Sequence, residues 1–139
     1  MNSEFDDLQE QILEDARKKY SEITIDYFMN PRNFGELDGH NGFSRVTGPC
    51  GDSISIWIKV VDDVISDITF KTDGCGTSIA SASMITTLAK GKTLQEAQEI
   101  GKEDVLEALG GLPEDSEHCG QLASDTLKEA IKNFVHSKK

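Results

Sequence analysis

Three cysteines, Cys50, Cys75 and Cys119, are the residues of this chain whose type and setting best suit chemistry. Each is followed directly by a glycine, and 24 and 43 residues separate them along the chain. The sequence has no Cys-x-x-Cys pair, which argues against a zinc ribbon and a thioredoxin-type redox site. Glycine beside a thiolate lets backbone N–H groups, or a bulky inorganic ligand, come close to the sulfur.

All three cysteines lie where we expect secondary-structure elements to begin or end. Cys50 precedes a strand, Cys75 lies between a strand and a helix, and Cys119 opens the last helix. The positive end of a helix favours the thiolate form of a cysteine. One such cysteine is as often a small buried core residue as a ligand. Three in the same setting favour convergence at one edge of a small sheet, where they would bind a metal or a cluster.

Two neighbouring residues could complete four-coordination. Asp52 follows Cys50 by two positions, and His118 directly precedes Cys119. Three thiolates with one carboxylate or imidazole suit Zn²⁺ or a two-iron cluster. Oxygen and imidazole donors are harder than thiolate and hold iron–sulfur centres less firmly, so a mixed set favours a labile site. The residue types alone leave open that Asp52 is a turn residue and His118 a solvated loop residue.

Hydrophobic periodicity predicts the elements that must position these residues. Alternation over residues 53–60 and 64–70, with Asp62 and Asp63 between them, predicts an antiparallel hairpin, and a short strand is expected over residues 43–47. Spacings of three and four residues predict helices over residues 4–29, 78–90, 94–100, 104–109 and 120–135, with a movable loop over residues 110–119. Strands first and helices afterwards predict an α+β fold, with a small antiparallel three-stranded sheet and helices packed on one face.

Length and charge narrow the class of protein. The 139 residues suit a single domain, residues 1–139, with residues 1–19 as a helical N-terminal arm. A net charge of −11 argues against nucleic-acid binding, and no apolar run reaches the roughly 18 residues of a membrane span. The acidic N-terminus lacks the apolar core of a secretory signal, so we expect a cytoplasmic protein whose thiols stay reduced.

The sequence contains five short stretches whose order and spacing are informative: Asn30-Pro31-Arg32-Asn33-Phe34-Gly35, Cys50-Gly51-Asp52, Gly74-Cys75-Gly76-Thr77-Ser78-Ile79-Ala80-Ser81-Ala82-Ser83, Gly91-Lys92-Thr93-Leu94 and His118-Cys119. Over residues 20–136 this pattern resembles the iron–sulfur cluster assembly scaffold family, of the IscU and NifU N-terminal type. The glycine-flanked cysteine that runs into a helix of small residues is its most specific part.

The resemblance implies a scaffold and carrier rather than an enzyme. A transient [2Fe-2S] cluster would be assembled from iron and from persulfide sulfur supplied by a cysteine desulfurase of the IscS or NifS type, and then transferred to apo iron–sulfur proteins. By the same resemblance, Cys50, Cys75 and Cys119 are ligands, Cys119 is also the persulfide acceptor, Asp52 keeps the cluster transferable, and Asp52 or His118 is the fourth ligand. It further implies Zn²⁺ on these residues in the cluster-free form and an iron donor or frataxin-like partner. The sequence leaves open whether the chain forms a homo-oligomer, in which a cluster would bridge two copies.

One departure concerns a partner. Many members of the family carry a Leu-Pro-Pro-Val-Lys stretch that an Hsp70-type chaperone recognises, and here the residues are Leu112-Pro113-Glu114-Asp115-Ser116-Glu117. Only the first two residues match, so the resemblance does not extend to that chaperone contact.

Two alternative functions stay open, a zinc-dependent sulfurtransferase of the SufU type and a structural zinc domain that only binds partners. Relatives of the SufU type usually carry an insertion between the second and third cysteines. The 43-residue interval here leaves no room for one, which favours the scaffold.

Overall fold

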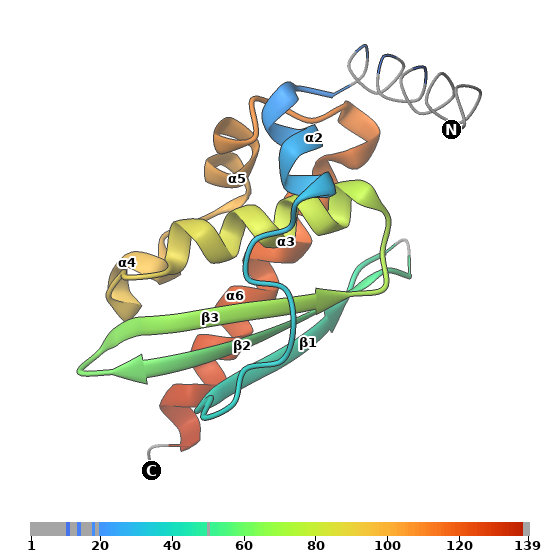
Figure 1. The fold of residues 1–139 in the computed structure, drawn as a ribbon. Coiled ribbons are helices and arrows are strands. Elements are labelled where there is room, and N and C mark those ends of the chain that lie inside the picture. The colour runs from blue at the N-terminus through green and yellow to red at the C-terminus, as the bar shows by residue number, and fades with distance from the viewer. Residues whose placement is uncertain (1–10, 12–13, 15–17, 19, 50, 138–139) are drawn as a thin grey trace, which may run out of the picture.

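The computed structural model of the chain describes residues 11, 14, 18, 20–49 and 51–137. Figure 1 shows the arrangement of its helices and strands. In chain order the elements are α2 (Glu22–Met29), β1 (Gly42–Thr47), β2 (Ser53–Val61), β3 (Val64–Thr72), α3 (Gly76–Ala89), α4 (Leu94–Gln98), α5 (Lys102–Ala108), the 3₁₀ helix η1 (Glu114–Ser116) and α6 (Glu117–Ser137). Among the described residues, no helix combines the length and the apolar character that crossing a membrane requires.

The three strands form one antiparallel sheet in the order β1-β2-β3. The turn between β2 and β3 places Asp62 and Asp63 at φ values of 53° and 63°. A tight hairpin turn of this kind needs positive φ at both central residues, and aspartate tolerates that conformation better than most residues. The predicted hairpin, its turn and the short first strand are therefore confirmed.

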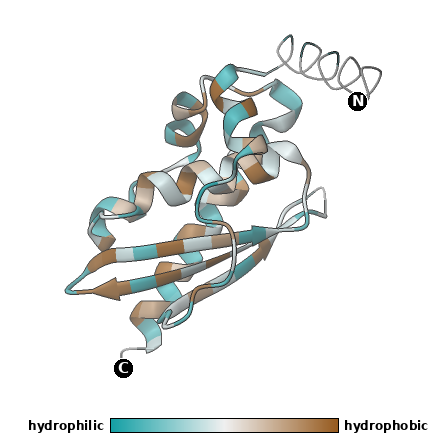
Figure 2. Cartoon of the chain, in the orientation of Figure 1, coloured by the Kyte–Doolittle hydropathy of each residue, from teal (hydrophilic) through white to brown (hydrophobic). Residues whose placement is uncertain are grey.

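The core lies on one face of the sheet. Ile54, Ile56 and Ile58 alternate along β2 with residues of the other face and are fully buried. Figure 2 shows the same alternation of apolar and polar residues along β2 and β3. Helix α3 packs on β3, and α6 packs on β1 and β2 (Figure 1). The α+β fold with helices on one face of a three-stranded sheet is confirmed.

The opposite face of the sheet is crossed by the segment that joins α2 to β1, which passes in front of the strands in Figure 1. Phe34 forms a parallel bridge with Phe70 at the edge of β3, and the two rings meet edge to face at 5.4 Å. The Nζ atom of Lys71 lies 3.2 Å from Oε2 of Glu36 on the same segment. Helix α2 is thereby attached to the third strand as well as to the helical layer.

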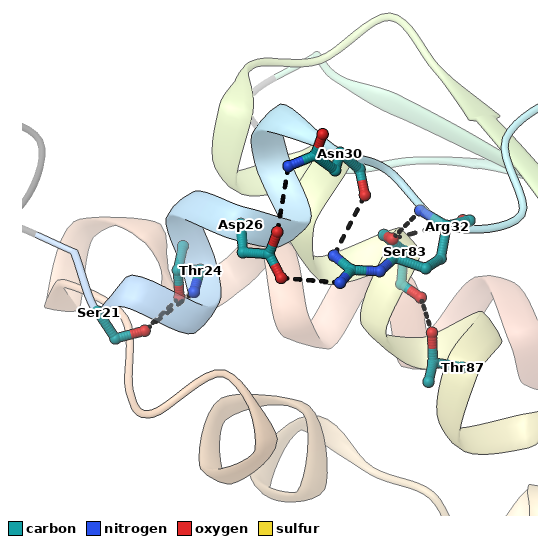
Figure 3. Close-up of polar contacts among 7 residues, drawn as sticks. All are labelled: Ser21, Thr24, Asp26, Asn30, Arg32, Ser83 and Thr87. Atoms are coloured by element: carbon teal, nitrogen blue, oxygen red, sulfur yellow. Dashed lines mark hydrogen bonds and ion pairs between the residues drawn. The ribbon is translucent and has the colours of Figure 1, made fainter. Parts of the chain in front are cut away.

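Helix α2 differs from the prediction in where it begins and in which face it buries. It begins at Glu22, because the Ser21 hydroxyl accepts a hydrogen bond from the Thr24 N–H at 3.0 Å and caps the helix (Figure 3). Ile23, one of the apolar residues whose spacing predicts this helix, is 46% exposed, whereas Thr24 is buried. Thr24 is buried because its hydroxyl and that of Ser21 both donate hydrogen bonds to the carbonyl oxygen of Leu109. Nearly all of the predicted arm, residues 1–19, lies outside the described residues.

The last helix starts earlier than predicted. Residues 114–116 form η1 and α6 begins at Glu117, so the loop predicted over residues 110–119 is wrong from residue 114 onward. Pro113 precedes η1, and Glu114, Asp115 and Glu117 lie in the first turns. Proline and acidic residues are favoured at helix starts, because no N–H partner is lost there and negative charge complements the helix dipole. The acidic residues of the predicted loop therefore lie at the start of a helix.

Candidate functional site

Cys75 occupies the N-terminal end of α3. It is the N-cap residue, with extended backbone at φ −78° and ψ −174°, and its side chain is exposed. Partial burial raises the pKa of the Cys75 thiol, but hydrogen bonds from the Thr77 hydroxyl and from the backbone N–H groups of Ser78 and Thr77 lower it by more. The pKa therefore lies below the ordinary thiol value, and the thiolate, which is the nucleophile and the metal ligand, is favoured.

Cys119 is the third residue of α6 and is only 1% exposed. The predicted position at the start of the last helix is confirmed. The predicted placement on a movable loop is wrong, because α6 already includes Glu117 and His118. As it stands in this conformation, the Cys119 sulfur is not accessible to a partner protein.

Two hydroxyls of α3 bring the sulfurs of the two helix starts together. The Thr77 Oγ1 atom lies 3.1 Å from the Cys75 Sγ and 3.4 Å from the Cys119 Sγ. The Ser78 Oγ atom lies 3.5 Å from the Cys119 Sγ. These distances are within hydrogen-bonding range for sulfur, so Cys75 and Cys119 belong to one site although 43 residues separate them in the sequence.

Asp52 joins this cluster through Ser78, whose hydroxyl donates to the Asp52 Oδ2 atom at 3.2 Å. The approach is close: a Cβ on Gly74 would lie 2.9 Å from the same oxygen and 2.7 Å from the Ser78 Cβ. Glycine at position 74 is thus a steric requirement of the contact. Cys50, two residues before Asp52, lies outside the described residues.

His118 contacts the site directly, with its Nε2 atom 3.6 Å from the Cys119 Sγ. It is half-buried, and its neighbour Glu117 forms an ion pair with Lys102 at 3.7 Å. Of the five residues predicted for the site, the structure links Cys75, Cys119, Asp52 and His118 through a chain of side-chain contacts that includes Thr77 and Ser78.

The described residues alone do not form a closed metal site. Within residues 20–49 and 51–137, no three His, Cys, Asp or Glu side chains stand close enough to hold a metal ion. The donor types nevertheless fit: two thiols with a carboxylate or imidazole beside them suit Zn²⁺ or a two-iron cluster once a third thiolate is added. The outstanding donor in the sequence is Cys50.

Helix α2 lies beside the Cys75 end of α3. A Cβ on Gly76 would stand 2.7 Å from two ring carbons of Phe28, so the aromatic ring packs directly on the residue after Cys75. Arg32 fixes the end of α2 (Figure 3): its guanidinium donates to Asp26 at 2.7 Å, and its backbone N–H donates to the Ser83 hydroxyl at 2.7 Å. The Asn-Pro-Arg-Asn turn therefore connects α2 to α3 through hydrogen bonds.

Sequence reasoning did not assign a role to Thr77 or Ser78. The signal that could have found them is their position: hydroxyls two and three residues after a cysteine that caps a helix lie in its first turn, close to that cysteine. What the sequence could not show is that the same hydroxyls reach Cys119 on another helix.

Known proteins are similar to this chain in sequence and in fold. The profile of the NifU-like N terminal domain family matches residues 19–139. The iron-sulfur cluster assembly scaffold protein IscU 1 of Archaeoglobus fulgidus is 48% identical over 116 residues, which cover 83% of this chain and 76% of the relative. The scaffold protein IscU of Escherichia coli is 46% identical over 120 residues, covering 83% of this chain and 93% of the relative.

Among solved structures, a candidate iron-sulfur cluster assembly scaffold protein for the SUF system of Fervidobacterium islandicum superposes with a TM-score of 0.66. It is 25% identical, and the match covers 81% of this chain and 96% of that one. The resemblance drawn from the cysteine motifs is confirmed by these matches. With a family profile matching nearly the whole chain and relatives close to half identical, the protein belongs to the NifU-like N-terminal domain family and is similar to the IscU scaffold proteins.

Proposed function

We propose that this chain is a scaffold on which a [2Fe-2S] cluster is assembled and from which it is passed to apo iron–sulfur proteins. The main support for the proposal is that the Cys75 and Cys119 sulfurs both contact the buried Thr77 hydroxyl. Asp52 is linked to this pair by a hydrogen bond from Ser78. The family supports the same role, since the relatives are named as scaffold proteins. The cluster is cargo in this proposal, and the chain is a carrier rather than an enzyme.

The ligands would be Cys50, Cys75 and Cys119, with Asp52 or His118 in the fourth place. Soft thiolates suit iron and inorganic sulfide, and a single harder donor loosens the set. Both candidates for the fourth place already border Cys119: His118 touches its sulfur, and Asp52 shares the Ser78 hydroxyl with it. The same donors would hold Zn²⁺ when no cluster is present.

Cys119 would be the acceptor of sulfur. Its thiolate attacks the terminal sulfur of a cysteine persulfide on the desulfurase, a new S–S bond forms at Cys119, and the desulfurase cysteine leaves as a thiolate, with no net oxidation. Because Cys119 is buried, this step needs local opening. Gly110 and Gly111, at φ values of 79° and 95°, connect α5 to η1, and the opening would require backbone rotation at these two residues.

Completion of the cluster requires further partners. Each persulfide sulfur takes two electrons to reach sulfide, one from a ferrous iron that becomes ferric and one from an external reductant of the reduced-ferredoxin class. The ferrous iron comes from an iron donor or frataxin-like protein. The proposal places these steps in the cytoplasm, where thiols remain reduced. The amount of iron bound per chain after reconstitution would report whether a cluster bridges two copies of the chain.

Anaerobic reconstitution of the full chain tests the proposal. The protein is mixed with ferrous iron, cysteine, a cysteine desulfurase and a reductant, and absorption spectra are followed before an apo-ferredoxin is added. We expect a [2Fe-2S] spectrum that moves to the ferredoxin. Persulfide on Cys119 with zinc retained and no chromophore would overturn the proposal in favour of the sulfurtransferase, and the absence of both signals would favour a structural zinc domain.

Replacement of Asp52 tests the source of lability. In Asp52→Ala the hard oxygen donor is removed, so the cluster should remain bound longer and transfer more slowly than from the unmodified chain. Asp38→Ala, at an exposed aspartate of the segment that crosses the sheet, is the matched control and should transfer at the unmodified rate. Unchanged transfer in Asp52→Ala would remove this residue from the release step.

A further inference from the structure

The Thr77 hydroxyl lies where it can act on both described sulfurs. It is 6% exposed, and its Oγ1 atom is within 3.1 Å of one sulfur on α3 and 3.4 Å of another on α6. The distance between the two sulfurs therefore cannot exceed the sum of these two contact distances. Because the sulfurs belong to α3 and α6, this one side chain relates the position of the two helices to the distance between the two ligands.

The location of Thr77 explains why its hydroxyl does not donate to a backbone carbonyl of its own helix. Buried threonines inside a helix usually donate to a carbonyl three or four residues earlier, as Thr86 does to Ser83 and Thr126 does to Leu122. Thr77 is the second residue of α3, and the residues three and four positions earlier, Gly74 and Asp73, precede the helix. Its hydroxyl therefore turns to the sulfurs instead.

We propose that Thr77 is a positioning residue, whose hydroxyl sets the separation and orientation of the Cys75 and Cys119 sulfurs for the metal-bearing cargo. Ser78 supports this arrangement, since its hydroxyl donates to Asp52 and lies 3.5 Å from the Cys119 Sγ. The inference rests on the proposed function only in that the same sulfurs would bind the cluster. It predicts that pre-arrangement of the thiols is lost when the hydroxyl is lost, even if the fold remains.

The expected loss of metal affinity can be estimated from what happens when a group hydrogen-bonded to a metal ligand is removed. Before metal binds, the Thr77 O–H can donate to one sulfur while the S–H of the other cysteine donates to the Thr77 oxygen, which pre-arranges both. A metal-bound thiolate is an acceptor only, so the O–H then stays on one of the two sulfurs and fixes its direction. Removal of such a group typically lowers metal affinity by 10- to 100-fold. Valine has nearly the shape of threonine without the hydroxyl, so Thr77→Val should lower affinity by about tenfold while the backbone remains in place.

Cobalt binding to the full chain measures this directly, without any cluster chemistry. Co²⁺ is titrated anaerobically into the unmodified protein and into Thr77→Val, Thr77→Ser and Thr126→Val, and the thiolate-to-cobalt charge-transfer absorption is followed. Thr126 is the matched control, because it is a fully buried threonine whose hydroxyl serves only its own helix in the described structure. We expect weaker binding and an altered charge-transfer band in Thr77→Val, rescue in Thr77→Ser, and no change in Thr126→Val.

Three results would overturn the inference: Thr77→Val that binds Co²⁺ as the unmodified chain does, Thr77→Ser that loses as much as valine, or no thiolate–cobalt absorption in the unmodified chain. Should Thr77→Val fail to fold by circular dichroism, the comparison of Thr77→Ala with Thr77→Ser decides the same point, with equal affinities counting against the hydroxyl. A chain that shows the cobalt pattern but assembles no [2Fe-2S] cluster would refute the proposed function and leave this inference standing.

Discussion

Gly74 is the residue at which the site geometry makes its strongest prediction. A Cβ at this position would stand 2.5 Å from the Ser78 Oγ, 2.7 Å from the Ser78 Cβ and 2.9 Å from the Asp52 Oδ2. Carbon atoms in contact normally lie about 3.5–4.0 Å apart, so Gly74→Ala requires a displacement of about 1 Å. Rotation of the Ser78 hydroxyl cannot relieve the contact with its Cβ, which is fixed to the helix backbone.

The displacement must therefore separate the loop before Cys75 from α3, or Asp52 from Ser78. Overpacking of this kind costs about 2 kcal/mol, which lowers the Tm of a chain of this size by about 7 °C. Because either displacement changes the position of Cys75 or of Asp52 relative to Ser78, we also expect Co²⁺ affinity to fall about tenfold. Thermal unfolding followed by circular dichroism and an anaerobic cobalt titration give the two quantities.

Gly120→Ala is the matched control, because it also alters a glycine beside a site cysteine. The nearest atom to a Cβ there is the Leu106 Cδ2 at 3.4 Å, an ordinary contact, and alanine inside a helix is favoured over glycine by up to about 1 kcal/mol. This variant should be as stable as the unmodified chain or more so. A Gly74→Ala protein that keeps its Tm and its cobalt affinity, or a Gly120→Ala protein that loses as much, would refute the steric reasoning.

Two further predictions concern stability. Hydrogen bonds from Arg32, and then from Asn30, hold the pKa of Asp26 below its usual range, so its contribution to stability is complete above about pH 4 and is lost as pH falls through the lowered pKa. Urea unfolding at several pH values should show a small deficit in Asp26→Asn above that pH and none at lower pH; a deficit that does not vary with pH would contradict the assignment. The Ser81 hydroxyl is buried without a hydrogen-bond partner among the described residues, so Ser81→Ala should raise the free energy of unfolding by about 1 kcal/mol, whereas Ser83→Ala, which loses the contact with Arg32, should lower it by about as much. Equal effects of the two serine changes would count against this explanation.

The sheet and the helix order could be predicted from sequence because their signals are local. Ile54, Ile56 and Ile58 alternate with residues of the other face, and the pair Asp62-Asp63 suits a tight turn. The helix N-terminus at Cys75 was predictable for the same reason, since a strand pattern ends and a helical pattern starts around it.

What the sequence could not supply are the contacts between segments distant along the chain. Thr24 is buried because a carbonyl oxygen of Leu109 accepts its hydroxyl, and no periodicity of α2 reveals that partner. Cys119 was expected at the end of a movable loop over residues 110–119, but it lies inside α6. Its burial against Thr77 and Ser78 is a tertiary contact.

The central claim is that Cys50, Cys75 and Cys119 act as ligands of one cargo, and protection from alkylation tests it most directly. The unmodified chain is labelled with iodoacetamide anaerobically, with and without a reconstituted [2Fe-2S] cluster, and labelling at each cysteine is measured by mass spectrometry. We predict that the cluster slows labelling of all three thiols, including the slow reaction of the buried Cys119 through local opening, and that removal of iron by a chelator restores the three cluster-free rates. A cysteine that reacts at the same rate with and without the cluster would contradict the claim.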